Sequence, residues 1–142
     1  MNKYDDISRF KEAQKLYYKI ALSEINNGKK ESHWIWFIFP QISGLGYSPT
    51  AEYYAIKDLD EAKEYWNDQL LHDHLVEISK ALLKLDNDIV EILGHVDSLK
   101  VKSCATLFYI ISKHDIFKSI IDKFYNGQWD AYTIQKTGGS VE

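Results

Sequence analysis

Apolar residues recur at helical spacing along almost the whole chain, with polar capping residues between the repeats. From Ile7 to Ile25 they follow the three- and four-residue steps of an amphipathic helix, with Asp6 as its expected cap and Gly28 as its stop. Further helices are expected at residues 49–56, 59–66, 68–85, 89–93, 98–111, 116–125 and 131–136. The sequence therefore predicts an all-α fold, a single multihelical domain of roughly seven to nine short helices.

The first helix is expected to pack on the core through one stripe and to expose its other side. The inward stripe comprises Ile7, Phe10, Ala13, Tyr17, Ile20, Ala21 and Ile25, and the outward side comprises Arg9, Lys11, Glu12, Lys15, Lys19 and Glu24. Later helices are expected to begin at side chains that accept a hydrogen bond from the first turn, namely Ser48, Asp58, Asn67 or Asp68, Asp97, Asp115 and Asp130.

The segment from Trp34 to Phe39 is strongly aromatic and ends at Pro40. Its residues favour strands, but no nearby segment is suited to pair with it. We therefore expect one or two helical turns here, capped by Ser32, ended by Pro40 and buried almost all round.

Composition limits the partners and the compartment. The 142 residues are 45% hydrophobic, enough for one domain over residues 1–142, with residues 1–5 and 137–142 expected to fray. The formal net charge is −4 and the charges alternate without a basic stripe, which argues against duplex nucleic acid as a partner. The longest apolar run is too short to span a membrane, and the first residues do not form a signal peptide. We expect a cytoplasmic protein that is a monomer or a weak homodimer.

Common catalytic and metal-binding motifs are missing from the sequence. It has no Gly-x-Ser-x-Gly, P-loop or His-Glu-x-x-His pattern, and His72 and His74 would diverge on a helix rather than hold one zinc ion. The one cysteine, Cys104, permits no internal disulfide and is expected to be a buried, inert thiol. We therefore expect no metal and no cofactor.

Two sets of residues resemble a bacterial family catalogued as domain of unknown function 1810. The first set is Ser32-His33-Trp34-x-Trp36-Phe37-x-Phe39-Pro40-Gln41-x-x-Gly44-Leu45-Gly46-x-Ser48, followed by Tyr54-x-Ile56, Glu61-Ala62 and Tyr65. The second set is Gly94, Asp97, Lys100, Ser103-x-x-Thr106-Leu107-Phe108, Phe117, Tyr125, Gly127, Asp130 and Thr133. The resemblance covers nearly the whole chain and implies a mostly helical domain, in a family that has no settled activity.

The resemblance has two limits. Members of the family often carry the label calpastatin, but that inhibitor is disordered and aromatic-poor, unlike this core-rich chain. The chain also departs from the family pattern, with Asp68-Gln69, Leu71-His72 and His74-Leu75 in place of His-Pro, Leu-Gly and Arg-Leu. This weakens any role that rests on an arginine at position 74. Ser103-Cys104-Ala105-Thr106 replaces Ser-Ser-Met-Thr and keeps its outer hydroxyls one helical turn apart.

His33 is the best candidate for proton transfer, because the pKa of histidine lies nearest neutrality. The alternative is a histidine that bonds a backbone carbonyl and orders the loop. Gln41, Gly44, Gly46 and Ser48 form a loop whose backbone N–H groups can point at an anion, with a helix start behind it. The alternative there is a tight turn between two short helices.

Two further groups of residues suit either a pocket or the protein interior. Lys100, Ser103 and Thr106 share a face of an otherwise apolar helix. This face either forms the wall of a pocket or is structural, with its polar groups hydrogen-bonded within the protein. Trp34, Trp36, Phe39, Tyr53 and Tyr54 suit a wall that stacks a flat ring, although such aromatics are more often core.

We therefore predict a cleft for an anionic, flat ligand such as a nucleotide or ADP-ribose derivative, with His33 as the candidate catalytic group. Its binding residues would be Ser32, Trp34, Trp36, Phe39, Gln41, Gly44, Gly46, Ser48, Tyr54, Lys100, Ser103 and Thr106. The alternative hypothesis is a non-enzymatic protein-interaction domain with no small-molecule site.

Overall fold

The structure, a computed structural model, describes residues 6–142, and that part of the chain contains nine helices. They are α1 Ser8–Asn26, α2 Ile35–Ile38, α3 Pro49–Tyr54, α4 Leu59–Asn67, α5 Gln69–Leu83, α6 Ile89–Leu93, α7 His95–Ser112, α8 Asp115–Phe124 and α9 Ala131–Thr137. The described residues form no strand, and their one β-type pairing is an isolated parallel bridge between Ile42 and Ile56. The predicted all-α class is confirmed, while the expected fraying of residues 1–5 falls outside the described residues.

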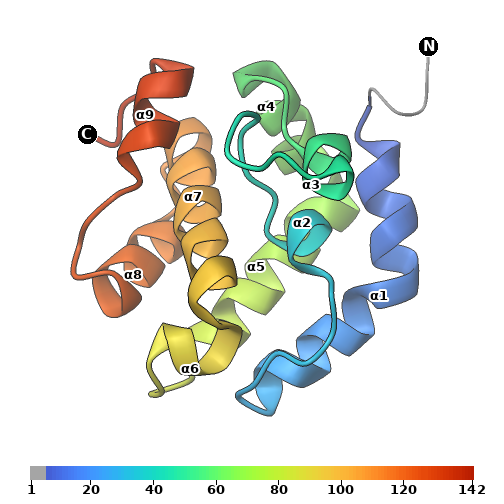
Figure 1. Ribbon diagram of the computed structural model, residues 1–142. Helices are drawn as coiled ribbons and strands as arrows, with labels where there is room; N and C mark the ends of the chain where they lie inside the picture. The colour runs from blue at the N-terminus through green and yellow to red at the C-terminus, as the bar shows by residue number, and fades with distance from the viewer. Residues whose placement is uncertain (1–5) are drawn as a thin grey trace.

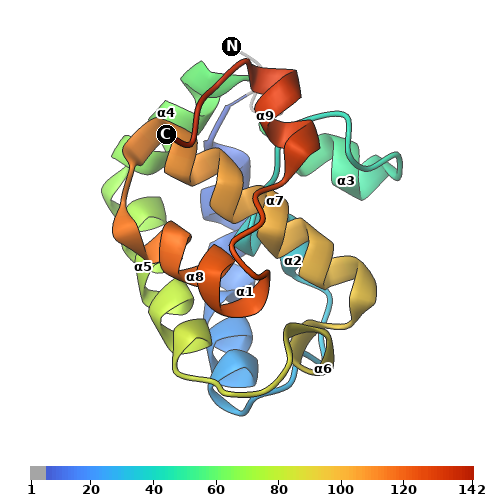
Figure 2. The same cartoon turned by 90° about the vertical axis from the view of Figure 1, so that its left-hand side faces the viewer.

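Helix α7 runs through the middle of the molecule and contacts α2, α4, α6, α8 and α9 (Figure 1). Helices α8 and α9 lie on one side of it, and α1 and α2 on the other (Figures 1 and 2). Helix α5 packs against α1, α4 and α8, and so joins the two sides. This arrangement explains why α7 was recognisable in the sequence as a helix that is apolar over most of its surface.

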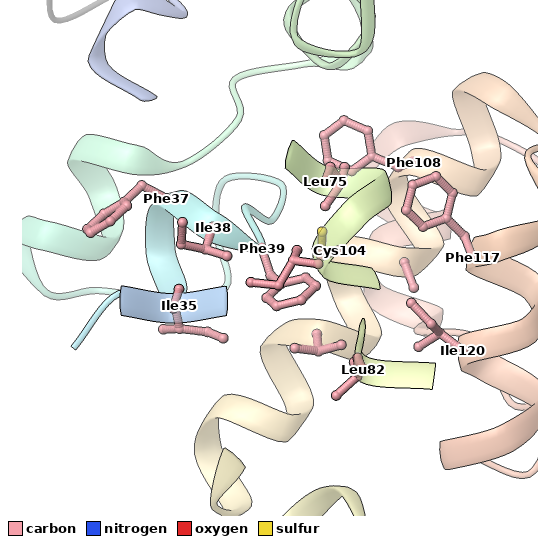
Figure 3. Close-up of a cluster of buried hydrophobic side chains, with 14 of the residues drawn as sticks. Ile35, Phe37, Ile38, Phe39, Leu75, Leu82, Cys104, Phe108, Phe117 and Ile120 are labelled. Carbon is pink, nitrogen blue, oxygen red and sulfur yellow. The ribbon is translucent and has the colours of Figure 1, made fainter. Parts of the chain in front are cut away.

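One hydrophobic core connects helices α1 to α8. Trp34, Phe39, Tyr65 and Phe108 are among its largest fully buried side chains. In Figure 3, Phe39 points from the end of α2 toward α5 and α7, whereas Phe37 points the other way, and its ring centre lies 5.1 Å from that of Tyr54. The aromatic segment thus contributes side chains to the core in two opposite directions. It contains a single helical turn at its centre, as the sequence predicts.

The division of α1 into buried and exposed residues differs from the prediction. Tyr17 and Ile20 are 42% and 43% exposed, although the periodicity placed them in the inward stripe. Gln14 and Tyr18 are buried instead, because α5 and α2 cover the face on which they lie. Arg9 was expected to face water and is buried.

Arg9 is buried because polar groups from distant segments surround its guanidinium. It pairs with Glu61 of α4, with Nη2 to Oε1 at 2.8 Å and Nη1 to Oε2 at 3.1 Å. It also donates to the carbonyl oxygens of Tyr53 and Ala55, each at 2.8 Å. A bidentate ion pair with added carbonyl acceptors is the arrangement in which a buried arginine is tolerated. It fastens α1 to α4 and to the end of α3.

Four of the expected helix caps are confirmed, and four are wrong. Ser48, Asp58, Asp68 and Asp130 each accept a hydrogen bond from the first turn of the helix that follows. Asp6 does not cap α1, because the residue before that helix is Ile7 and no side chain caps it, although Asp6 Oδ1 accepts the N–H of Ser8 at 2.9 Å. Ser32 does not cap α2, since the residue before that helix is Trp34 and has no side-chain cap. The other two errors concern α7 and α8.

Helices α7 and α8 each begin earlier than the cap prediction requires. Asp97 lies inside the first turn of α7, which starts after Gly94, where φ is +86°. Asp115 is the first residue of α8, and the ring Nδ1 of His114 accepts the N–H of Ile116 at 3.1 Å in its place. Asp97 is therefore available for ion pairs.

Candidate functional site

The carboxylate of Glu24, near the end of α1, holds the segment that precedes α2. Its Oε1 accepts hydrogen bonds from the N–H groups of Glu31 and Ser32, at 2.7 and 2.8 Å, and from Trp34 Nε1 at 2.9 Å. Its Oε2 accepts the Ser32 hydroxyl at 2.5 Å. Glu24 was expected to face water, but these four donors on one carboxylate fix the path of residues 31–34.

The same hydrogen bonds decide the charge of Glu24. Partial burial favours the neutral form and by itself raises the pKa. The hydrogen bonds from Ser32, Glu31 and Trp34 favour the carboxylate and outweigh burial, so the pKa is lowered to about 2. Glu24 is therefore ionised at neutral pH.

His33 lies at the surface between two residues that Glu24 binds. Its side chain is exposed, whereas Ser32 is half-buried and Trp34 is fully buried. The imidazole is thus open to solvent on this side of the molecule. Its catalytic role stays a prediction.

Two lysines and two tryptophans gather around Asp97 in the first turn of α7. Lys30 Nζ binds Asp97 Oδ2 at 2.9 Å and lies 5.0 Å from the centre of the Trp34 ring. Lys100 Nζ lies 3.6 Å from Asp97 Oδ1 and 5.3 Å from the centre of the Trp36 ring. We name Lys30, Trp34, Trp36, Asp97 and Lys100 the lysine–indole cluster. Through ion pairs and cation–π contacts it joins the segment before α2 to the start of α7.

The two lysines of the cluster are held differently. The Lys30 side chain is 8% exposed, and its ammonium also donates to Ser32 O at 2.5 Å, so it has two close partners. The Lys100 side chain is 18% exposed, and its 3.6 Å contact with Asp97 is longer than a hydrogen bond. An ammonium has three N–H donors. Lys100 therefore keeps donors that the described residues do not use.

Ser103 and Thr106 are buried on α7 and bind the residue that precedes α9. Ser103 Oγ lies within hydrogen-bonding distance of Leu99 O, at 3.2 Å, and of Asp130 Oδ2, at 3.1 Å. Thr106 Oγ1 donates to Lys102 O at 2.9 Å and accepts the N–H of Asp130 at 3.0 Å. Asp130 also caps α9, so these bonds fix the start of that helix against α7.

The loop from residue 41 to residue 48 leads from α2 to α3 and passes beside α9 (Figures 1 and 2). Its first part is held by the parallel bridge, in which the N–H of Ile56 donates to Gln41 O and the N–H of Ser43 donates to Ile56 O, both at 2.9 Å. Because Ile56 is used in this pairing, the helix expected at residues 49–56 ends at Tyr54.

Gly44 is the point at which this loop meets the C-terminal helix. Its φ of +97° favours glycine, and a Cβ here would overlap Tyr132 Oη and lie 3.8 Å from Lys136 Nζ. Gly46 is also close-packed, because a Cβ there would lie 2.6 Å from Ala51 Cβ. Both glycines therefore permit close approach, and α9 brings a hydroxyl and an ammonium to the loop.

Three other residues predicted for the site make structural contacts. Phe39 is fully buried in the core (Figure 3). Ser48 caps α3 by accepting the N–H of Ala51 at 3.1 Å. Tyr54 is half-buried and packs against Phe37.

The structure brings some of the predicted residues together and separates others. Trp36 and Lys100 meet, and the loop of residues 41–46 meets α9, whereas Phe39, Ser103 and Thr106 lie in the packed interior. The sequence prediction did not include Glu24, Lys30, Asp97, Tyr132 and Lys136. Asp97 is detectable from its three-residue spacing to Lys100 on one helix. The other four depend on contacts between distant segments.

Metal and thiol chemistry can be judged from the same residues. Within residues 6–142, no three His, Cys, Asp or Glu side chains are placed to hold a metal ion. Cys104 is buried, and burial raises the pKa of its thiol, so the reactive thiolate does not form at neutral pH. A bilayer-crossing helix is likewise not found in this range, since each helix is too short or too polar.

Comparison with known proteins gives a family and a fold. Over residues 4–137 the sequence matches the family described as "Protein of unknown function (DUF1810)". The crystal structure of the conserved hypothetical protein Rv1873 from Mycobacterium tuberculosis is similar, with 36% sequence identity and a TM-score of 0.92 over 96% of this chain and 99% of that chain. None of the curated proteins matches. Because the family match spans nearly all of its sequence, this chain belongs to the DUF1810 family.

Proposed function

We propose that this protein binds a small anionic ligand with a flat ring, of the nucleotide or ADP-ribose class, at the lysine–indole cluster and the adjoining loop of residues 41–46. The observation that carries the proposal is the state of Lys100. Its ammonium lies over the indole of Trp36, is mostly shielded from solvent, and has no hydrogen-bonded carboxylate among the described residues. A shielded cation with unused N–H donors is suited to bind a phosphate oxygen.

Trp36 supplies a surface for the ring of the ligand. Its side chain is only half-buried, so part of the indole is accessible. Stacking a base on an aromatic side chain contributes about 1–3 kcal/mol and tolerates different bases. Lys100 can keep its methylene stem on the indole while its ammonium turns to an anion.

A second cation and a hydroxyl come from α9, the helix whose preceding residue, Asp130, binds Ser103 of α7. Ser103 is one helical turn after Lys100 and binds Asp130, which is two residues before Tyr132. Tyr132 Oη and Lys136 Nζ both approach Gly44. These contacts support a ligand that extends from the indole of the cluster toward the loop of residues 41–46, with anionic groups at both lysines.

His33 is the proposed proton carrier for a ligand that is processed rather than only bound. Its imidazole is exposed and adjacent in sequence to Trp34 of the cluster. A His33→Ala variant should bind the ligand with nearly unchanged affinity but lose turnover, which product analysis by mass spectrometry would show. Equal turnover by this variant and the unaltered protein would remove His33 from the mechanism.

A thermal-shift screen with AMP, NAD and ADP-ribose tests the binding proposal. A ligand at 100 times its Kd stabilises a folded protein by about 2.7 kcal/mol. Lys100→Ala and Trp36→Leu should each remove most of the shift. Lys63→Ala, an exposed lysine of α4 outside the cluster, serves as the control and should keep it. The proposal fails if none of the compounds raises the melting temperature, or if Lys100→Ala and Lys63→Ala behave alike.

A second candidate function is binding of another protein, which an exposed apolar flank of α1 favours. Leu16, Tyr17 and Ile20 are 70%, 42% and 43% exposed and lie within little more than one helical turn. Ile20→Glu should release a protein bound there while leaving any nucleotide-induced shift intact. If Ile20→Glu and the unaltered protein recover the same partners from a cell extract, this flank is not the interface.

A further inference from the structure

A groove of about 470 Å³ lies between α1 and α5, away from the lysine–indole cluster. Its lining includes Gln14, Lys15, Tyr18, Lys19, Leu70 and His74, and none of the cluster residues. The two helices run side by side and are in direct contact (Figure 2). This volume falls within the range of small-molecule sites, which are mostly apolar with a few placed polar groups.

The base of the groove is rigid because two rings are stacked and bonded there. The rings of Tyr18 and His74 lie 3.6 Å apart, centre to centre, with 6° between their planes. Tyr18 Oη donates to Glu77 Oε1 at 2.5 Å and lies 3.1 Å from His74 O. The Tyr18 side chain is therefore held at both its ring face and its hydroxyl.

The contacts of Gln14 determine which nitrogen of His74 carries the proton. Gln14 Nε2 donates to Phe37 O at 2.7 Å and to Tyr65 Oη at 2.9 Å, which fixes the orientation of the buried amide. Gln14 Oε1 is then the atom that faces His74 Nδ1, at 2.8 Å, and it can only accept. His74 Nδ1 therefore carries the hydrogen.

The other ring nitrogen of His74 is consequently a hydrogen-bond acceptor. Burial lowers the pKa of His74, against the opposite effect of the Glu77 and Asp73 carboxylates, so the ring is neutral at pH 7. With Nδ1 protonated, a neutral imidazole has its lone pair on Nε2. Within residues 6–142 this atom has no hydrogen-bond partner, although its ring lines the groove.

The rim of the groove on the α1 side is cationic. Lys11, Lys15 and Lys19 follow one another at four-residue spacing and all line it, together with Glu12. Lys11 is paired with Asp68 at 3.0 Å. Lys15 and Lys19 have no ion pair within the described residues, so the rim has an excess of positive charge.

We propose that this groove binds a hydroxylated organic acid with an apolar body of medium length. The carboxylate would pair with Lys15 and Lys19, and the apolar body would lie against Leu70 and Tyr18. The hydroxyl would donate to Nε2 of His74. Charge complementarity selects an anion over a cation, and the fixed tautomer selects a donor over an acceptor.

The test is isothermal titration of the whole protein with 10-hydroxydecanoate, decanoate and decyltrimethylammonium, all kept below micelle-forming concentrations. The hydroxy acid should bind about fivefold more tightly than decanoate, the effect of one added hydrogen bond, and the cation should not bind. Lys15→Glu/Lys19→Glu should weaken binding of both acids by about tenfold or more, because two rim cations become anions. Lys100→Ala is the matched control and should bind both acids as the unaltered protein does, which separates this site from the lysine–indole cluster.

A separate measurement tests whether His74 accepts the hydrogen bond of the ligand hydroxyl. His74→Phe keeps a ring for stacking and should abolish the preference for the hydroxy acid. Should that variant fold poorly, the ring ¹⁵N resonances of the unaltered protein report the tautomer directly, and the Nε2 resonance should shift on adding 10-hydroxydecanoate but not decanoate. The proposal is overturned if neither acid binds, if the charge reversals leave affinity unchanged, or if the cation binds as well as the acids. Equal affinity for the two acids overturns the assignment of His74.

Discussion

Replacing Glu24 by glutamine should make the stability of this protein less dependent on pH in the acidic range. The substitution keeps the size of the side chain but removes the charge that four hydrogen bonds stabilise. It thus tests the claim that α1 organises the segment carrying Ser32, His33 and Trp34.

The size of the effect follows from the pKa of Glu24, which is lowered from 4.5 to about 2. At about 1.4 kcal/mol for each pKa unit, the full change corresponds to about 3 kcal/mol. Because the carboxylate is partly open to solvent, screening reduces the expected value to about 1–2 kcal/mol. A pKa that is lower in the folded state stabilises the fold above the unfolded pKa, and this stabilisation is lost as the pH falls from about 4.5 toward 2.

Urea unfolding followed by circular dichroism at pH 7, 5, 4 and 3 measures the effect. At pH 7 the Glu24→Gln variant should have a free energy of unfolding about 1–2 kcal/mol lower than that of the unaltered protein, and the gap should narrow between pH 5 and pH 3. Asp6 and Asp68 also have lowered pKa values, but they are present in both proteins and cancel in the difference. A gap that is the same at pH 7 and pH 3 would refute the reasoning.

Three other predictions concern residues outside the segment of residues 31–34 that Glu24 holds. Arg9→Ala should lower the free energy of unfolding by about 3–5 kcal/mol, because it leaves Glu61 buried without its partner, and the double variant Arg9→Ala/Glu61→Ala should cost less than the sum of the single changes in urea titrations. Gly44→Ala should lower stability by about 1–3 kcal/mol through overlap with Tyr132, and Tyr132→Ala should rescue part of the loss in the double variant. Cys104 should react with a thiol reagent only after unfolding in urea, and reaction of the folded protein at pH 8 would contradict its burial.

The helices could be predicted because local periodicity indicates them and because α3, α4, α5 and α9 also carry the expected capping side chain. The errors arise where a distant residue changes the use of a side chain. Asp97 has the sequence character of a cap, but α7 begins at His95, and the Asp97 carboxylate pairs with Lys30 from another segment instead. His114 performs the capping that was assigned to Asp115, although the side chains preferred at this position are those of Ser, Thr, Asp and Asn.

The buried face of α1 could not be predicted from hydrophobicity alone. Arg9 and Gln14 are inside because Glu61 and the carbonyl of Phe37 provide partners for them. Tyr17 is partly exposed because no helix among residues 6–142 covers its flank fully. A pattern of apolar residues ranks side chains by their cost of exposure, whereas burial of a polar group depends on a partner that the sequence does not identify.

In the candidate site, too, some contacts could be predicted from the sequence and others could not. The contact of Trp36 with Lys100 follows the prediction that the aromatic segment and α7 converge. The contribution of Tyr132 and Lys136 could not be foreseen, because it depends on how the connection after α8 returns α9 to the loop at Gly44. Ligand binding at these residues stays a prediction.

The attachment of α9 to α7 has a consequence for motion. Ser103 and Thr106 each have a second partner on their own helix, Leu99 O and Lys102 O. If α9 separates from α7, both hydroxyls keep a hydrogen bond within α7, so their loss of partners does not oppose local opening of residues 131–142. Amide exchange should then be faster in α9 than in α7, and a ligand that bridges Lys100 and Lys136 would slow it.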